Sequence, residues 1–193
     1  NGVQLYQLYG KKYDDKMWDK LLDQLTVKEM RSLVEYDGYG NGAVESIGKV
    51  RQTDVDGPAA LNNNFTKQGS IGLPSSVSVA STWNKDLAKE FGDIIGQMAK
   101  DMGVTGWYAP AQNIHRSQYA GRNFEYFSED PLVSGTMASL EIKNAQAHGI
   151  YAFMKHFAMN DEEDGRLAQM HTWSNEQAMR EIYLKPFEMS VKD

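Results

Sequence analysis

Lys155 and His156 directly follow a short apolar run, Tyr151–Met154. Both their residue types and their position in the chain are suited to binding a ligand or to catalysis. An apolar run of this length indicates a buried strand. Polar side chains are costly to bury unless they meet a partner or a ligand. Ligands bind at the carboxyl ends of strands in parallel α/β folds. The run therefore predicts a ligand site, with the lysine and the histidine directed into it.

Further polar residues follow the ends of other predicted strands. Asp56 follows a weak strand over 47–55, and Arg122 lies in the long loop after a strand over 104–109. A carboxylate beside lysine, histidine and arginines suits a polyhydroxylated ligand, because vicinal hydroxyls need both acceptors and fixed donors. The candidate ligand-binding residues are Asp56, Arg122, Lys155, His156 and Arg166.

Aromatic side chains in the loops are candidates for the pocket wall. They are Trp107, Tyr108, Phe124, Tyr126 and Phe127. For the last three of these, packing within the loop is favoured over contact with a ligand. Arg122 is also a candidate for an ion pair with one of the acidic residues that follow it, Glu125, Glu129 or Asp130.

The order of predicted elements indicates an α/β fold. From about residue 47, strands alternate with helices, which predicts parallel βαβ units. Such units occur in (β/α)8 barrels and in open doubly wound sheets. The open sheet calls for a glycine-rich phosphate loop after its first strand, and neither G-x-G-x-x-G nor G-x-x-x-x-G-K-S/T occurs. The barrel is therefore favoured.

The number of strands limits how much of a barrel is present. Four strands are predicted, over 47–55, 77–80, 104–109 and 150–154. A full barrel takes about 250 residues. We therefore expect a helical segment, 1–46, that packs on the barrel, and the first part of a (β/α)8 TIM-like barrel domain, 47–193. A start without Met agrees with a piece of a longer polypeptide, which is expected to supply the rest.

Local signals predict where the helices begin. Capping residues place helix starts at Thr26, Asn84 and Asp130. Ser174–Gln177 predicts a capping box for a last helix, in which Pro186 causes a break, a kink or a new turn.

The composition excludes several classes of function. The formal net charge is -6 and no Lys/Arg-rich run occurs, so nucleic acid is not an expected partner. Without cysteine there are no disulfides and no thiolate zinc sites. The acidic run Asp161–Asp164 is typical of a solvated loop, and neither a metal nor a cofactor is expected. No apolar stretch approaches the roughly 20 residues that span a bilayer. The sequence does not determine the cellular compartment.

Five motifs, in order along the chain, carry a family resemblance. They are Asp56-Gly-Pro-Ala, Asn113-Ile-His-Arg-Ser117, Gly121-Arg-Asn-Phe-Glu-Tyr-Phe-Ser-Glu-Asp-Pro131, Lys155-His-Phe-x-x-Asn160-x-x-Glu163-x-x-Arg166 and Glu181-Ile-Tyr-Leu-Lys-Pro-Phe-Glu188. A single one of these would be weak, whereas five in sequence are specific. From about residue 50 to its end the chain resembles glycoside hydrolase family 3.

The resemblance implies a (β/α)8-like domain followed by an α/β sandwich domain. It implies a retaining exo-β-glycosidase, β-glucosidase-like, that hydrolyses terminal non-reducing β-linked sugars. Asp56 would accept hydrogen bonds from the 4- and 6-hydroxyls of the sugar in subsite −1. Arg122, Lys155 and His156 would hold the side of the 2- and 3-hydroxyls. Arg166 would support the pocket. The implied partners are an oligosaccharide or β-glycoside substrate and the remainder of the same polypeptide.

Two differences from the family pattern limit what the resemblance implies. Asn62 stands where the family motif Asp-Gly-Pro-Ala-Gly-Leu-Arg has arginine, which leaves the exact sugar and linkage open. The family's nucleophile is an aspartate, usually before tryptophan, on a later strand. No Asp-Trp pair follows the Lys155 motif, so no catalytic residue is assigned to this chain. The alternatives are a non-catalytic carbohydrate-binding or sensing protein and a structural α/β domain without a site.

Overall fold

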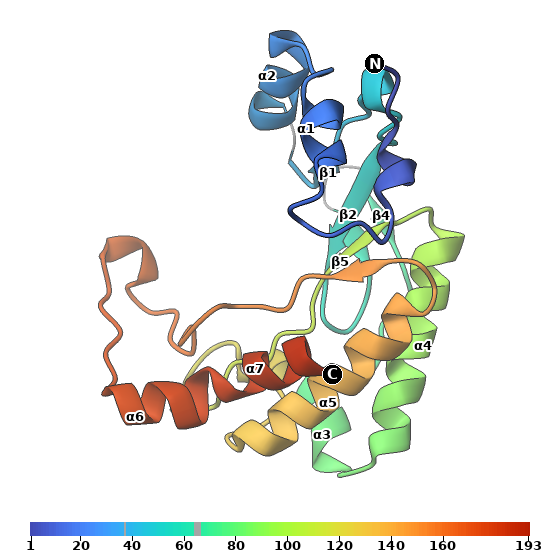
Figure 1. Ribbon diagram of the computed structural model, residues 1–193. Coiled ribbons are helices and arrows are strands. Elements are labelled where there is room, and N and C mark those ends of the chain that lie inside the picture. The colour runs from blue at the N-terminus through green and yellow to red at the C-terminus, as the bar shows by residue number, and fades with distance from the viewer. Residues whose placement is uncertain (37, 64–66) are drawn as a thin grey trace. The chain divides into compact units, whose positions relative to one another are not determined.

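The computed structural model of the protein describes residues 1–36, 38–63 and 67–193 (Figure 1). Contacts along the chain divide it into two compact units, residues 1–54 and residues 55–193. The predicted domain boundary between residues 46 and 47, and the packing of the first segment on the barrel, stay predictions.

The first unit is mainly helical. It contains the 3-10 helices η1 (Leu5–Leu8) and η2 (Glu45–Ile47), the helices α1 (Met17–Leu22) and α2 (Val27–Glu35), and the strand β1 (Gly40–Asn41). The Thr26 hydroxyl accepts a hydrogen bond from the backbone N–H of Glu29, whose carboxylate accepts one from the N–H of Thr26. This reciprocal pair confirms the predicted capping box. The apolar core of the first unit is small and consists of Leu8, Leu21, Val44 and Ile47.

The second unit is built on a sheet with the strand order β4-β3-β2-β5-β6. The strands are β2 (Gln52–Asp56), β3 (Asn62–Asn63), β4 (Gln68–Gly69), β5 (Gly106–Tyr108) and β6 (Tyr151–Ala152). Strand β2 begins in the first unit, where it pairs with β1. The strands β2, β3 and β4 pair antiparallel, whereas β5 and β6 pair parallel. The chain passes from β5 to β6 through a helix, so the predicted βαβ unit is confirmed.

The other regular elements of the second unit are helices. They are α3 (Ser76–Ser81), α4 (Lys85–Asp101), α5 (Pro131–Gln146), α6 (Glu176–Ala178) and α7 (Lys185–Lys192), with the 3-10 helices η3 (Asn123–Glu125) and η4 (Arg166–Ala168) and a π-helical turn η5 (Met179–Tyr183). Figure 1 shows α4 and α5 side by side, and α7 packs on α5. The side chains of Asn84 and Asp130 accept hydrogen bonds from the first turns of α4 and α5, as predicted.

The predicted strand over 77–80 is wrong, because these residues lie in helix α3. The neighbours Val79 and Ala80 are both buried in the core of the second unit. Successive residues of a strand point to opposite faces, whereas neighbours on a helix share a broad face. A helical turn therefore buries both residues against one core, and the Val-x-Val alternation does not decide the structure.

Other elements differ from the prediction in their bounds. The strand predicted over 47–55 begins only at Gln52, and Ile47 instead ends the 3-10 helix η2. The sequence does not predict the short hairpin of β3 and β4, since its strands hold three polar residues and a glycine and carry no apolar period. Asn175 rather than Ser174 caps α6, and Pro186 lies in the first turn of α7, which confirms that it starts a new turn.

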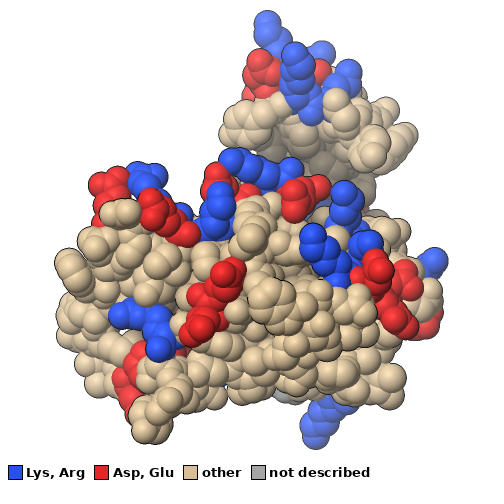
Figure 2. All heavy atoms as spheres, turned by 90° about the horizontal axis from the view of Figure 1, so that it is seen from below, with Lys and Arg blue, Asp and Glu red and all other residues tan. Residues whose placement is uncertain are grey.

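Charged side chains of both signs lie intermixed on the face drawn in Figure 2. A surface that binds the phosphate backbone of nucleic acid carries mainly one sign. Within the part of the chain that the structure describes, no helix combines the length and the apolar character needed to cross a membrane.

Candidate functional site

The predicted residues Asp56 and Lys155 meet in the second unit. The Nζ atom of Lys155 lies 2.6 Å from Oδ1 of Asp56, and the backbone N–H of Gly57 donates to the same oxygen at 2.8 Å. The lysine side chain is 17% exposed and the carboxylate 39% exposed. The pair thus presents a cation and an acceptor at a partly buried surface, where a ligand can reach both.

The sheet positions both members of this pair. Asp56 is the last residue of β2, and the buried indole of Trp107 on β5 donates to the carbonyl oxygen of Gly57 at 2.8 Å. Lys155 follows β6 and pairs with Ala111 in an isolated parallel bridge, shifted by one residue from the β5–β6 register. Because β5 lies between β2 and β6 in the sheet, it fixes the separation of the two side chains.

His156 is held by its backbone as well as by its ring. The amide of Asn113 donates to the carbonyl oxygen of His156 at 2.7 Å, and its Oδ1 accepts from the backbone N–H of His156 at 2.6 Å. Asn113 itself is buried. This two-point contact fixes where the imidazole leaves the chain, although the sequence prediction did not assign Asn113 to the site.

Arg122 comes from the loop after β5 and lies against the ring of His156. Its Nη2 is 3.0 Å from Nε2 of His156, and its Nη1 is 3.2 Å from Oε1 of Glu163. Its Nε donates to the buried carboxylate of Glu125. Arg122 therefore takes part both in the predicted ion pair with an acidic neighbour and in the cluster around His156.

Arg166 reaches the cluster indirectly. Its Nη1 lies 2.9 Å from Oε2 of Glu163, and its side chain is half exposed. Glu163 thus bridges two arginines, one through each carboxylate oxygen. Sequence reasoning placed Glu163 in a motif without giving it a role, and the signal for one was its three-residue spacing to Arg166.

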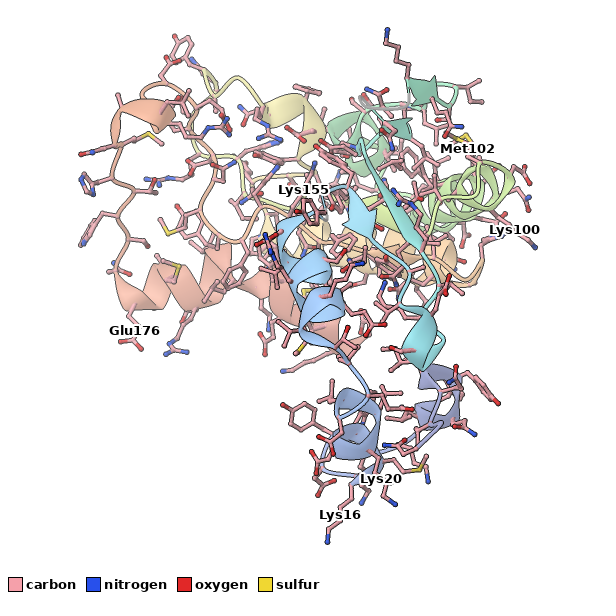
Figure 3. The ribbon with its side chains drawn as sticks, turned by 90° about the horizontal axis from the view of Figure 1, so that it is seen from above. Lys16, Lys20, Lys100, Met102, Lys155 and Glu176 are labelled. Carbon is pink, nitrogen blue, oxygen red and sulfur yellow. The ribbon has the colours of Figure 1, made fainter. Side chains whose placement is uncertain are left out.

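A shallow cavity of about 380 Å³ lies beside three of the five predicted residues, whereas Arg122 and Arg166 are not among the residues that line it. It is lined by Asp56, Tyr108, Phe153, Met154, Lys155 and His156, and Figure 3 labels Lys155 among the side chains of the structure. Its volume falls in the range typical of small-molecule sites. A second hollow, of about 430 Å³, lies over Arg116, Asp161 and Trp173 and holds none of the five predicted residues.

The aromatic residues proposed for the pocket wall lie in different surroundings. Tyr108 lines the cavity, whereas Trp107 and Phe127 are buried in the core and Phe124 is exposed. Tyr126 is fully buried, and its hydroxyl faces His156 at 3.4 Å from Nδ1. Packing in the loop is thus confirmed for Phe127, but Tyr126 also reaches the site.

The electrostatics of the cluster keep the imidazole neutral. Burial, followed by the positive charges of Arg122 and Lys155, lowers the pKa of His156 to about 4. Burial opposes the charge of Arg122, but its hydrogen bonds and attraction to Glu125 and Glu163 outweigh that cost and raise its pKa. The site therefore holds a permanent cation beside a neutral ring, an arrangement suited to an uncharged polar ligand.

Among residues 1–36, 38–63 and 67–193, no three histidine, aspartate or glutamate side chains gather in an arrangement that holds a metal ion. The carboxylate, ammonium and guanidinium groups of the cluster offer hydrogen-bond acceptors and donors at fixed places.

Comparison with known proteins points to one family. Residues 63–193 match the model of the glycosyl hydrolase family 3 N-terminal domain. Over 158 residues, 81% of this chain, it is 40% identical to β-glucosidase A of Butyrivibrio fibrisolvens, of which it covers 19%. A β-glucosidase of Rhizobium radiobacter is 36% identical over 91% of the chain, which covers 22% of that protein. The chain thus spans about a fifth of the length of these relatives.

Solved structures agree. β-Glucosidase 3B of Thermotoga neapolitana, in complex with glucose, superposes with a TM-score of 0.80 at 37% identity, over 90% of this chain and 27% of that one. The β-glucosidase of Kluyveromyces marxianus in complex with glucose gives a TM-score of 0.82 at 34% identity, over 90% of this chain and 21% of that one. Sequence and fold together show that this α/β chain belongs to glycoside hydrolase family 3 and carries part of that family's N-terminal (β/α)8 barrel domain.

Proposed function

We propose that the protein to which this chain belongs is a retaining exo-β-glycosidase, β-glucosidase-like, which hydrolyses terminal non-reducing β-linked sugars. The observation that carries the proposal is the Asp56–Lys155 pair, 2.6 Å apart and beside His156 in one cavity. It gives a sugar an acceptor and donors at neighbouring hydroxyl groups. The β-glucosidase relatives, two of them bound to glucose, support the same substrate class.

The proposal gives each side chain a role in subsite −1. Asp56 accepts hydrogen bonds from the 4- and 6-hydroxyls, while Lys155, His156 and Arg122 hold the side of the 2- and 3-hydroxyls. Arg166 supports the pocket through Glu163, which it contacts at 2.9 Å. Contacts to these hydroxyls can strengthen as the sugar ring flattens toward the oxocarbenium-like transition state. No nucleophile and no catalytic acid are assigned to the 193 residues.

Hydrolysis of a 4-nitrophenyl β-glucoside by the complete protein tests the proposal. Lys155→Ala removes a charged donor and is expected to lower kcat/KM by roughly 10- to 100-fold, as loss of a charged hydrogen bond does. Lys143→Ala is the matched control, because Lys143 is an exposed lysine on helix α5. It is expected to leave kcat/KM unchanged.

Two results would count against the proposal. A complete, folded protein that hydrolyses none of a broad panel of nitrophenyl glycosides is not a glycosidase. If it still binds glucose, and Lys155→Ala abolishes that binding, the carbohydrate-binding alternative takes its place. If neither turnover nor binding responds to Lys155→Ala, the cavity is not a sugar site.

A further inference from the structure

The imidazole of His156 has a polar neighbour at each ring nitrogen. Its Nε2 lies 3.0 Å from Nη2 of Arg122, and its Nδ1 lies 3.4 Å from the hydroxyl oxygen of Tyr126. The two neighbours come from one loop but approach opposite sides of the ring. Each restricts, independently, which nitrogen of the imidazole carries the proton.

The contact with Arg122 requires a lone pair on Nε2. A guanidinium has five N–H donors and no acceptor, so its partner has to accept. Nε2 is therefore unprotonated in this arrangement. Because a neutral imidazole carries one ring proton, that proton is on Nδ1.

The contact with Tyr126 leads to the same assignment. The hydroxyl oxygen lies 2.7 Å from the carbonyl oxygen of Asn160, which can only accept, so the hydroxyl donates its proton there. The lone pairs that remain face the Asn160 amide nitrogen at 3.5 Å and Nδ1 of His156. The oxygen of Tyr126 thus accepts from a protonated Nδ1.

Burial preserves the protons that this arrangement needs. Tyr126 is fully buried, and burial raises the pKa of its phenol to about 12, so the hydroxyl keeps the proton that it donates to Asn160. The rings of Tyr126 and His156 meet edge to face, with centroids 6.1 Å apart and planes at 72°, which limits rotation of the imidazole.

We propose that Tyr126 is a positioning residue, which holds His156 in the Nδ1–H tautomer so that Nε2 accepts from Arg122 and orients the guanidinium. The sugar then meets the remaining N–H groups of Arg122 as donors, because the lone pair of Nε2 is already occupied by the N–H of Arg122. The effect on sugar binding rests on the proposed function of Arg122 and His156, whereas the tautomer does not.

Tyr126→Phe in the complete protein tests the proposal, with Tyr119→Phe as the matched control. Tyr119 is 85% exposed and lies in the same loop. Neutron diffraction from wild-type crystals is expected to place the ring proton on Nδ1. Tyr126→Phe removes the hydroxyl that contacts both Nδ1 of His156 and the carbonyl oxygen of Asn160, and glucose is expected to bind about fivefold more weakly by calorimetry, a loss of about 1 kcal/mol. For the nitrophenyl glucoside, KM is expected to rise more than kcat falls.

The outcomes separate the two proposals. A wild-type proton on Nε2 overturns the tautomer, and this measurement needs no variant. Glucose affinity of Tyr126→Phe equal to that of Tyr119→Phe overturns the positioning role. A complete protein that binds no glucose overturns the proposed function, and the position of the proton still decides the tautomer.

Discussion

Lys155 and Asp56 stand 99 positions apart in the chain, yet their side chains meet in a hydrogen bond of 2.6 Å. Asp56 is 39% exposed, so water screens the attraction. A double-mutant cycle with Lys155→Met and Asp56→Asn is expected to give a coupling of about 1 kcal/mol in the free energy of unfolding. Chemical denaturation of the complete protein measures it.

An exposed ion pair of the same chain is the control for this cycle. Arg180 and Glu176 lie 2.9 Å apart, but their side chains are 71% and 80% exposed. Arg180→Met with Glu176→Gln is expected to couple by no more than about 0.5 kcal/mol. Equal coupling in the two cycles would show that partial burial adds nothing to the Lys155–Asp56 pair.

His156 is expected to make the stability of the protein depend on acidic pH. Its pKa is about 4 in the folded protein, against 6.5 for the free side chain. Between these values the unfolded chain binds more protons, so the contribution of His156 to stability is present above about pH 6.5 and is lost as the pH falls toward 4. The melting temperature of His156→Gln should therefore fall less between pH 7 and pH 5 than that of the wild type.

His171 serves as the comparison for the histidine experiment, because it is exposed. His171→Gln should keep the wild-type dependence of the melting temperature on pH. If His156→Gln keeps it too, the imidazole of His156 is not neutral in the folded protein.

Glu141 on helix α5 predicts a pH dependence of opposite sign. It is completely buried, and neither carboxylate oxygen has a hydrogen-bond partner among the described residues. Burial raises the pKa of Glu141 well above its usual value of 4.5. Its contribution to stability is therefore present below about pH 4.5 and is lost as the pH rises toward the pKa of the folded state.

Removing this carboxyl is expected to stabilise the protein at neutral pH. Glu141→Met should raise the free energy of unfolding at pH 7 by roughly 1–3 kcal/mol, the cost of burying a polar group without a partner. The gain should shrink as the pH is lowered to 4.5. Glu90→Met, at an exposed position of helix α4, is the control and should show neither effect. A stability difference between Glu141→Met and the wild type that does not grow as the pH rises from 4.5 would contradict a buried neutral Glu141.

Gly92 is expected to be required for the close approach of helices α4 and α5. A Cβ atom at this position would lie 2.3 Å from the backbone oxygen of Glu141, which cannot rotate away. Alanine would gain roughly 1 kcal/mol of helix propensity, but the helices would have to separate, at a cost of about 1–3 kcal/mol. Gly92→Ala should therefore lower the melting temperature by a few degrees.

Gly72→Ala controls for the general effect of replacing glycine. A Cβ atom at Gly72 meets nothing within 4 Å. This variant should melt like the wild type or slightly above it. A Gly92→Ala protein that melts as high as Gly72→Ala would mean that α4 and α5 have room between their backbones.

Local patterns predicted the elements that are long and capped. The capping residues Thr26, Asn84 and Asp130 each begin the helix that the sequence placed after them. Hydrogen bonds of a helix cap run between residues only two or three positions apart, so they can be recognised from spacing alone. The residues 77–80 became a helix because the core of the fold buries Val79 and Ala80 together, and no local pattern contains that information.

The amino-acid sequence by itself determined the family, because the order and residue types of its motifs are visible in one dimension. It also named Asp56, Arg122, Lys155, His156 and Arg166 as candidates. Only the tertiary structure decided which of them meet: Asp56 with Lys155, and Arg122 with His156. It alone brought the hydroxyl of Tyr126 to the imidazole, because contacts between side chains 30 to 99 positions apart depend on how strands and loops pack and not on spacing.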